Sequence, residues 1–104
     1  MHRMLALIDH MTDELKDSKS YALCAAKCKD TDRSLSETYS QMARERLEAY
    51  KRLKQQCSRL YDEKTRRATE EGKDTTHITE VHEWACEKLT HEECELSKMI
   101  EAAR

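Results

Sequence analysis

The chain contains no proline and a single glycine, Gly72, among its 104 residues. Tight turns between β-strands depend on glycine and proline, so a chain almost without them has few ways to build a sheet. Such a sequence favours long α-helices joined by short polar links. We therefore expect an all-α protein.

Apolar side chains recur at three- and four-residue steps, the spacing of one helical face, in three segments of the chain. We expect helices over about residues 3–29, 35–70 and 77–102 of a single helical domain, residues 1–104. The first stripe consists of Met4, Leu5, Ile8, Met11, Leu15, Ala22 and Ala26. The second consists of Leu35, Tyr39, Met42, Ala43, Tyr50, Leu53, Cys57, Leu60 and Tyr61, and the third of Ile78, Val81, Ala85, Leu89, Leu96, Met99 and Ile100.

The two links carry signals for helix ends. Ser34, followed three residues later by Glu37, has the spacing of a capping box and predicts the start of the second helix. Gly72 offers that helix a left-handed stop, and Thr75 or Thr76 then caps the third. The polar stretch before Gly72 predicts that the second helix projects past its packing partner or frays there. Short links make neighbours antiparallel, so we expect an antiparallel three-helix bundle that oligomerisation would complete to a four-helix type.

Composition excludes several classes of function. Hydrophobic and charged residues each make up 38% of the chain, which predicts a narrow core. The net charge is −2, with both signs interspersed and no basic block, so we expect no nucleic-acid partner. No apolar run approaches the ~18 residues that span a membrane, and the N-terminus lacks the apolar region of a signal peptide. We therefore expect a cytoplasmic protein without a membrane partner.

Five cysteines without a secretory signal indicate reduced thiols. Cys24 and Cys28 lie one helical turn apart, where two side chains diverge too far to form a disulfide with each other. They could share a metal ion, but the pattern lacks the CxxC pairs of a zinc site. We interpret the thiols as structural or incidental.

Polar residues on the predicted faces suggest one cluster. Glu14, Tyr21 and His10 fall on the margin of the first stripe, Arg46 at the centre of the second, and Glu92 inside the third. Folding the two hairpins brings Glu14 near Arg46 and Glu92 near His10. An arginine within an apolar stripe needs a partner, because an unpaired buried charge costs several kcal/mol, on the order of 3–5. The alternative is that Arg46 reaches along the stripe to water.

The segment DELKDSKSY, in which Tyr21 follows Glu14 by seven residues, resembles the first metal-ligand helix of ferritin-like proteins. The segment SETYSQMARERLEAYKRL is similar to their second helix, and the resemblance covers about residues 4–61. It implies a helical bundle in which carboxylates and a histidine hold two iron or manganese ions. Short encapsulated ferritins, which this first hairpin also resembles, complete their bundle by oligomerising.

The second helix departs from the family pattern at Glu-x-x-His. By helical phase, Arg46 and Ala49 occupy those two positions. Glu45 and Glu48 keep the spacing, but they face outward and no histidine follows. The guanidinium of Arg46 would repel a metal cation and would pair with Glu14 in place of that cation. The resemblance then implies a ferritin-like scaffold whose metal site became a Glu14–Arg46 ion pair, without a cofactor.

No HExxH, nucleophile motif or phosphate loop occurs, so catalysis is unsupported. His77, Trp84 and His91 share one line at heptad spacing, which is typical of a packing or partner face.

Two functions remain. The first is a non-catalytic helical interaction or assembly protein, a homo-oligomer and most simply a dimer. The second is a ferritin-like protein that oxidises or stores iron. Its site would be completed across a subunit interface by Glu14, His10, Glu92 and either Glu45 or Glu48.

Overall fold

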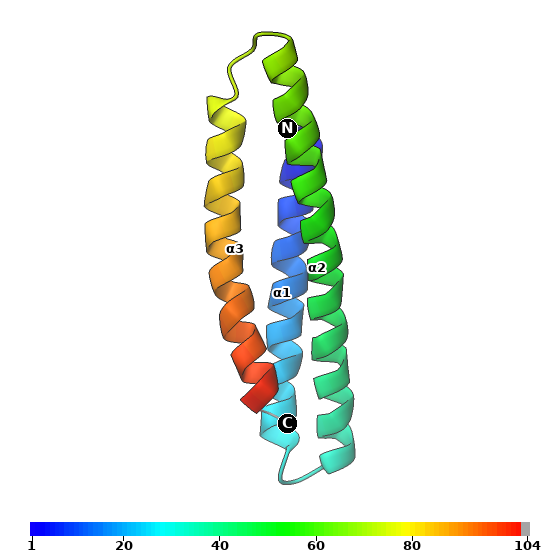
Figure 1. Ribbon diagram of the computed structural model, residues 1–104. Helices are drawn as coiled ribbons and strands as arrows, with labels where there is room; N and C mark the ends of the chain where they lie inside the picture. The colour runs from blue at the N-terminus through cyan, green and yellow to red at the C-terminus, as the bar shows by residue number, and fades with distance from the viewer. Residues whose placement is uncertain (103–104) are drawn as a thin grey trace.

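A computed structural model describes residues 1–102 as three helices, α1 (His2–Cys28), α2 (Arg33–Glu70) and α3 (Thr76–Ala102), with no strand in that range. The helices run down, up and down in an elongated bundle of 61 × 17 × 16 Å (Figure 1). This confirms the all-α, three-helix prediction, with each described helix end within two residues of its expected place. None of the described helices is both long enough and apolar enough to cross a membrane.

The α1–α2 link ends in an aspartate cap. The side chain of Asp32 accepts a hydrogen bond from the backbone N–H of Leu35 at 3.1 Å, and α2 begins at the following residue, Arg33. This satisfies one of the free N–H groups of the first helical turn. The capping box predicted at Ser34 is therefore wrong, because Ser34 already lies inside the helix.

The second link follows the prediction more closely. Gly72 has φ +70°, and Lys73 N–H donates to the carbonyl of Ala68 at 2.7 Å while Gly72 N–H donates to that of Thr69 at 3.1 Å. These are the two bonds of a Schellman motif, which needs a left-handed residue at this place. The polar end of α2 stays helical to Glu70, and it extends with the start of α3 beyond the N-terminus of α1 (Figure 1).

Helices α1 and α2 form the most extensive interface of the bundle, through small buried residues. Ser18 Oγ donates to the carbonyl oxygen of Ala43 at 2.6 Å, and Ser36 Oγ donates to that of Ala25 at 2.7 Å. Each serine thus binds the backbone of the opposite helix. Small side chains allow this close approach, and the two bonds satisfy hydroxyl groups that burial would otherwise leave unpaired.

The core follows the predicted stripes, with five differences among the apolar residues. Leu5, Ala26 and Leu35 are exposed although they belong to predicted stripes, and Ala25 and Leu47 are buried although they do not. The buried apolar residues of the core are Met4, Ile8, Met11, Leu15 and Ala22 of α1, Ala43, Leu47, Tyr50 and Cys57 of α2, and Ala85, Leu89, Leu96 and Ile100 of α3.

Candidate functional site

The predicted ion pair between α1 and α2 is present. Arg46 Nη1 lies 3.3 Å from Glu14 Oε2 and 3.4 Å from Oε1, so one guanidinium nitrogen faces both carboxylate oxygens. Because α1 and α2 run antiparallel on either side of the Asp32 link, Glu14 and Arg46 lie at the same height along the bundle. The Arg46 side chain is 42% exposed and that of Glu14 22% exposed.

Arg46 lies at the margin of α2's buried face rather than at its centre. Its neighbour Leu47, 100° further round the helix, is the buried residue, together with Ala43 and Tyr50 one turn away on either side. Both charges therefore stay in contact with water, and the pair belongs to the class of surface ion pairs worth about 0–1 kcal/mol. The prediction that Arg46 lies at the centre of the buried stripe is therefore wrong.

The other three members of the predicted cluster lie elsewhere. Tyr21 is half-buried and stacks on Tyr39, with ring centroids 6.3 Å apart. His10 is exposed, because it lies 100° away from its buried neighbour Met11. Glu92 is half-buried and lines a groove between α1 and α3. Within residues 1–102, neither His10 nor Glu92 forms a hydrogen bond or ion pair with the Glu14–Arg46 pair, so the cluster of five reduces to two.

The carboxylates that could restore a ferritin-like pattern point to solvent. Glu45 accepts a hydrogen bond from the side chain of Gln41, Glu48 pairs with Lys51 on the same helix, and both are exposed. This confirms their outward direction. Over the described range 1–102, no three His, Cys, Asp or Glu side chains are placed to hold one metal ion.

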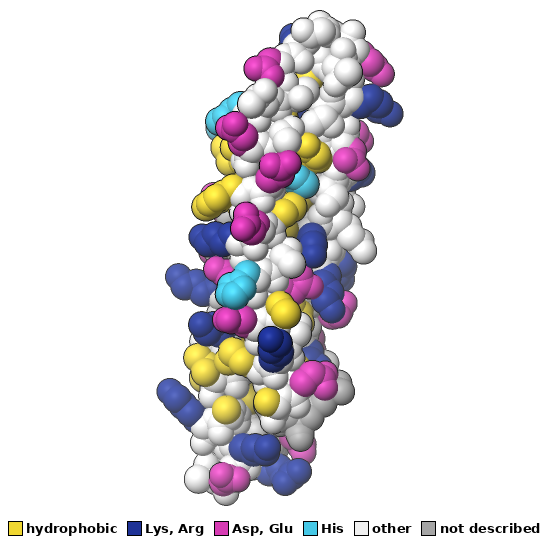
Figure 2. Space-filling view, turned by 60° about the vertical axis from the view of Figure 1, so that its left-hand side comes forward, with side chains coloured by type: hydrophobic (Ala, Val, Ile, Leu, Met, Phe, Trp, Pro, Cys, Tyr) yellow, Lys and Arg dark blue, Asp and Glu magenta, His cyan; other side chains and the backbone are white. Residues whose placement is uncertain are grey.

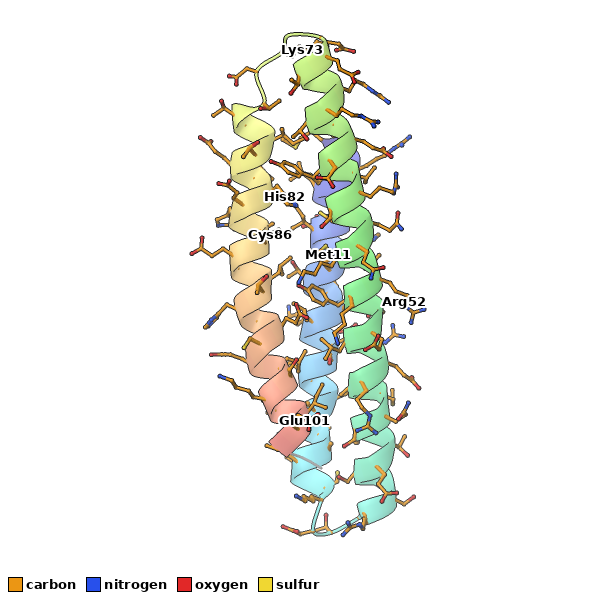
Figure 3. The ribbon with its side chains drawn as sticks, in the orientation of Figure 1. Met11, Arg52, Lys73, His82, Cys86 and Glu101 are labelled. Carbon is orange, nitrogen blue, oxygen red and sulfur yellow. The ribbon has the colours of Figure 1, made fainter. Side chains whose placement is uncertain are left out.

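A second polar group lies between α2 and α3 and was not predicted. Tyr61 stacks on His82 with ring centroids 3.9 Å apart and planes 3° apart, and its hydroxyl shares a 3.1 Å hydrogen bond with that of Thr79. Cys86 Sγ lies 3.5 Å from His82 Nε2, one turn along α3 (Figure 3). The four-residue spacing of His82 and Cys86 on an apolar face was the available signal.

Burial keeps this group uncharged near neutral pH. It lowers the pKa of His82 below its ordinary 6.5, against the opposing charges of Asp62 and Glu83. It raises the pKa of Cys86, and also that of Cys57 across the interface. A reactive cysteine needs a lowered pKa and an adjacent cation. The charge of Lys54 acts to lower the pKa of Cys86, but burial outweighs it and favours the neutral thiol.

Grooves run along both sides of α3, which contacts α1 and α2 less extensively than they contact each other. The α2–α3 groove, about 620 Å³, is lined mainly by long charged side chains of α2 over Leu47 and Ile100. The α1–α3 groove, about 350 Å³, has Leu15, Leu96 and Met99 in its lining. Trp84 of α3 is 59% exposed, with Lys88 Nζ 5.2 Å from its ring centroid.

Comparison with protein families, curated proteins and solved structures found no match to this chain. Its function therefore has to be inferred from the geometry of the three helices.

Proposed function

We propose that this chain is a non-catalytic helical interaction protein that assembles with another helical surface, most simply as a cytoplasmic homodimer. The observation that carries the proposal is the incomplete closure of α3. Grooves remain on both of its sides, while Leu5, Leu23 and Trp84 stay 45%, 45% and 59% exposed. Exposed apolar side chains, on a chain that also has open grooves, are typical of a surface that a partner covers.

The chemistry of the interior supports a non-catalytic role. The buried thiols and His82 are held in their neutral forms, and Glu14 is occupied by the guanidinium of Arg46. We propose that this pair stands where a ferritin-like scaffold would hold its metal. A cation at Glu14 would meet the positive charge of Arg46 at once, which disfavours its binding.

The test is the mass of the protein in solution. Sedimentation equilibrium at tens of micromolar should give a particle of about twice the 12.3 kDa of the single chain. A monomer over the whole concentration range would contradict self-assembly. Metal analysis of protein purified without chelators tests the rival function: stoichiometric iron or manganese would contradict a filled site and support a ferritin-like metal protein.

A further inference from the structure

One side of the bundle, which we name the α1–α3 face, carries two rows of side chains with the same spacing. Each row steps through seven, four, three and four residues, the spacing of a coiled-coil seam. All ten residues are exposed except Thr12, which is half-buried. The α1 row is Leu5, Thr12, Lys16, Lys19 and Leu23, and the α3 row is His77, Trp84, Lys88, His91 and Glu95.

Residues that share one groove fix how the two rows lie against each other. The α1–α3 groove is lined from one helix by Thr12, Leu15, Lys16 and Lys19, and from the other by Glu92, Glu95, Leu96 and Met99. The two helices run in the same direction (Figure 1). Continuing both rows three turns towards their N-termini, at the same rise per residue, brings Leu5 to about the level of Trp84.

The charges of this face are divided between its helices. Lys16 and Lys19 line the groove from α1, while Glu92 and Glu95 line it from α3. Within the described chain, Lys16, Lys19 and Glu92 form no ion pair or hydrogen bond, and Glu95 pairs only with the exposed His91 of its own helix. A basic edge and an acidic edge at one level thus remain without partners on the other helix.

We infer that the α1–α3 face binds the same face of a second copy, with the two-fold axis parallel to the helices. This inference rests on the proposed function and names its surface. Such an axis places each α1 over the partner's α3 at the same level, so Lys16 and Lys19 meet the partner's Glu92 and Glu95. Trp84 then meets the partner's Leu5. An isologous contact of this kind is self-complementary at the level of the groove, where α1 contributes Lys16 and Lys19 and α3 contributes Glu92 and Glu95.

The alternatives fit less well. A two-fold axis perpendicular to the helices would lay α1 on α1 and gather the lysines of both copies. The larger α2–α3 groove has charged side chains of both signs on α2 alone, so it offers no separate basic and acidic edges. Figure 2, in which the α3 side comes forward, shows small hydrophobic groups between basic and acidic side chains.

Charge reversal tests the arrangement. Lys16→Glu/Lys19→Glu should raise the dissociation constant of the dimer by about tenfold or more, since four attractive contacts become repulsive. Glu92→Lys/Glu95→Lys should do the same. The variant with all four changes should recover to within about threefold of the wild type, because every cross-copy pair is restored with its signs exchanged. Lys51→Glu/Arg52→Glu on α2 changes the net charge equally away from the face and should leave the constant unchanged.

Sedimentation equilibrium supplies the constants, and circular dichroism confirms that each variant is folded. Trp84, the single tryptophan, gives a second readout, since its fluorescence should shift to shorter wavelength as protein concentration rises. Trp84→Glu, a change at an exposed position that should not affect folding, should also weaken the dimer. If the wild type is a dimer but the charge reversals leave its dissociation constant unchanged, the α1–α3 face is not the interface. The same follows if the variant with all four changes does not recover. Either result leaves the proposed function standing. A monomeric wild type overturns both the proposed interface and the proposed function.

Discussion

Tyr50 of α2 carries a buried hydroxyl without a hydrogen-bond partner within residues 1–102. The side chain is 0% exposed and packs in the centre of the core. Burial raises the pKa of Tyr50 well above its ordinary value. The charge of the Glu93 carboxylate, and its closeness to the hydroxyl as a hydrogen-bond acceptor, add to the rise, although no hydrogen bond of ordinary geometry joins the two groups. Glu93 itself is bound to Lys54 at 3.1 Å. The ring of Tyr50 therefore stabilises the fold while its hydroxyl opposes it.

We expect Tyr50→Phe to be neutral or to stabilise the protein by up to about 1 kcal/mol. A buried polar group without a partner costs about 1–3 kcal/mol, and the substitution removes that group while it keeps the ring. The hydroxyl's packing contacts are lost, which offsets part of the gain. Tyr61→Phe is the matched control: its hydroxyl is bonded to Thr79, so the same substitution should cost about 0.5–1.5 kcal/mol.

Urea unfolding followed by far-ultraviolet circular dichroism measures both changes, provided that the slope with denaturant stays constant among the variants. Because the apparent stability of a self-associating protein depends on its concentration, all variants are compared at one protein concentration. The reasoning is refuted if Tyr50→Phe loses more than about 1 kcal/mol, the net value of a typical hydrogen bond. That result would mean that the hydroxyl is satisfied in solution, with the Glu93 carboxylate as the nearest acceptor.

Three further changes have expected outcomes in the same assay. Ser18→Ala should cost about 1 kcal/mol, because it removes the buried bond to Ala43; no loss would mean that this bond contributes nothing net. A double-mutant cycle of Arg46→Ala and Glu14→Gln should give a coupling below about 1 kcal/mol, and a coupling near 3 kcal/mol would mean that the pair behaves as a buried one. His82, with its pKa lowered in the folded state, binds fewer protons there than in the unfolded chain. Its contribution to stability is complete above pH 6.5 and is lost as the pH falls towards the folded pKa, so His82→Phe should flatten this part of the pH profile.

The all-α fold could be predicted because the chain offers no residues that would break a helix except near Gly72. The helix start at the first link was less predictable, since Asp32 and Ser34 are both good caps and stand two residues apart. Asp32 is the residue that stays outside the helix, with an extended backbone at φ −147° and ψ 90°. The sequence contains both capping signals, and it does not indicate which of the two residues adopts the extended backbone of an N-cap.

The side chains of the candidate site show where helical wheels reach their limit. A wheel treats α2 as a cylinder with one buried face, but α2 packs on α1 and α3, and its face is broad. The predicted stripe has Arg46 at its centre and does not include Leu47, whereas in the structure Leu47 is buried and Arg46 is only half-buried. The predicted pairing of Glu14 with Arg46 is nevertheless present, because it depends on the position of each residue along the hairpin more than on its rotation about the helix axis.

Two buried serines show a second limit of predicting burial from the sequence of a single helix. Ser18 and Ser36 were left out of the predicted core because a hydroxyl counts as polar on any hydropathy pattern, yet both are buried. Each is buried because an acceptor stands opposite on the other helix, at Ala43 and Ala25. A single helix contains no information about that acceptor.

The distribution of charge over the helices shows why the open side belongs to α3. Helix α2 carries ten basic and six acidic residues, whereas α3 carries two basic and seven acidic ones. The Lys54–Glu93 pair joins the two within the chain, but Glu80, Glu83 and Glu87 project from the exposed face of α3. Mutual repulsion among these carboxylates disfavours a second α3 beside the first and favours a basic edge. In the proposed dimer the lysines of α1 in the other copy provide that edge, so the excess of glutamate on α3 selects what can cover it.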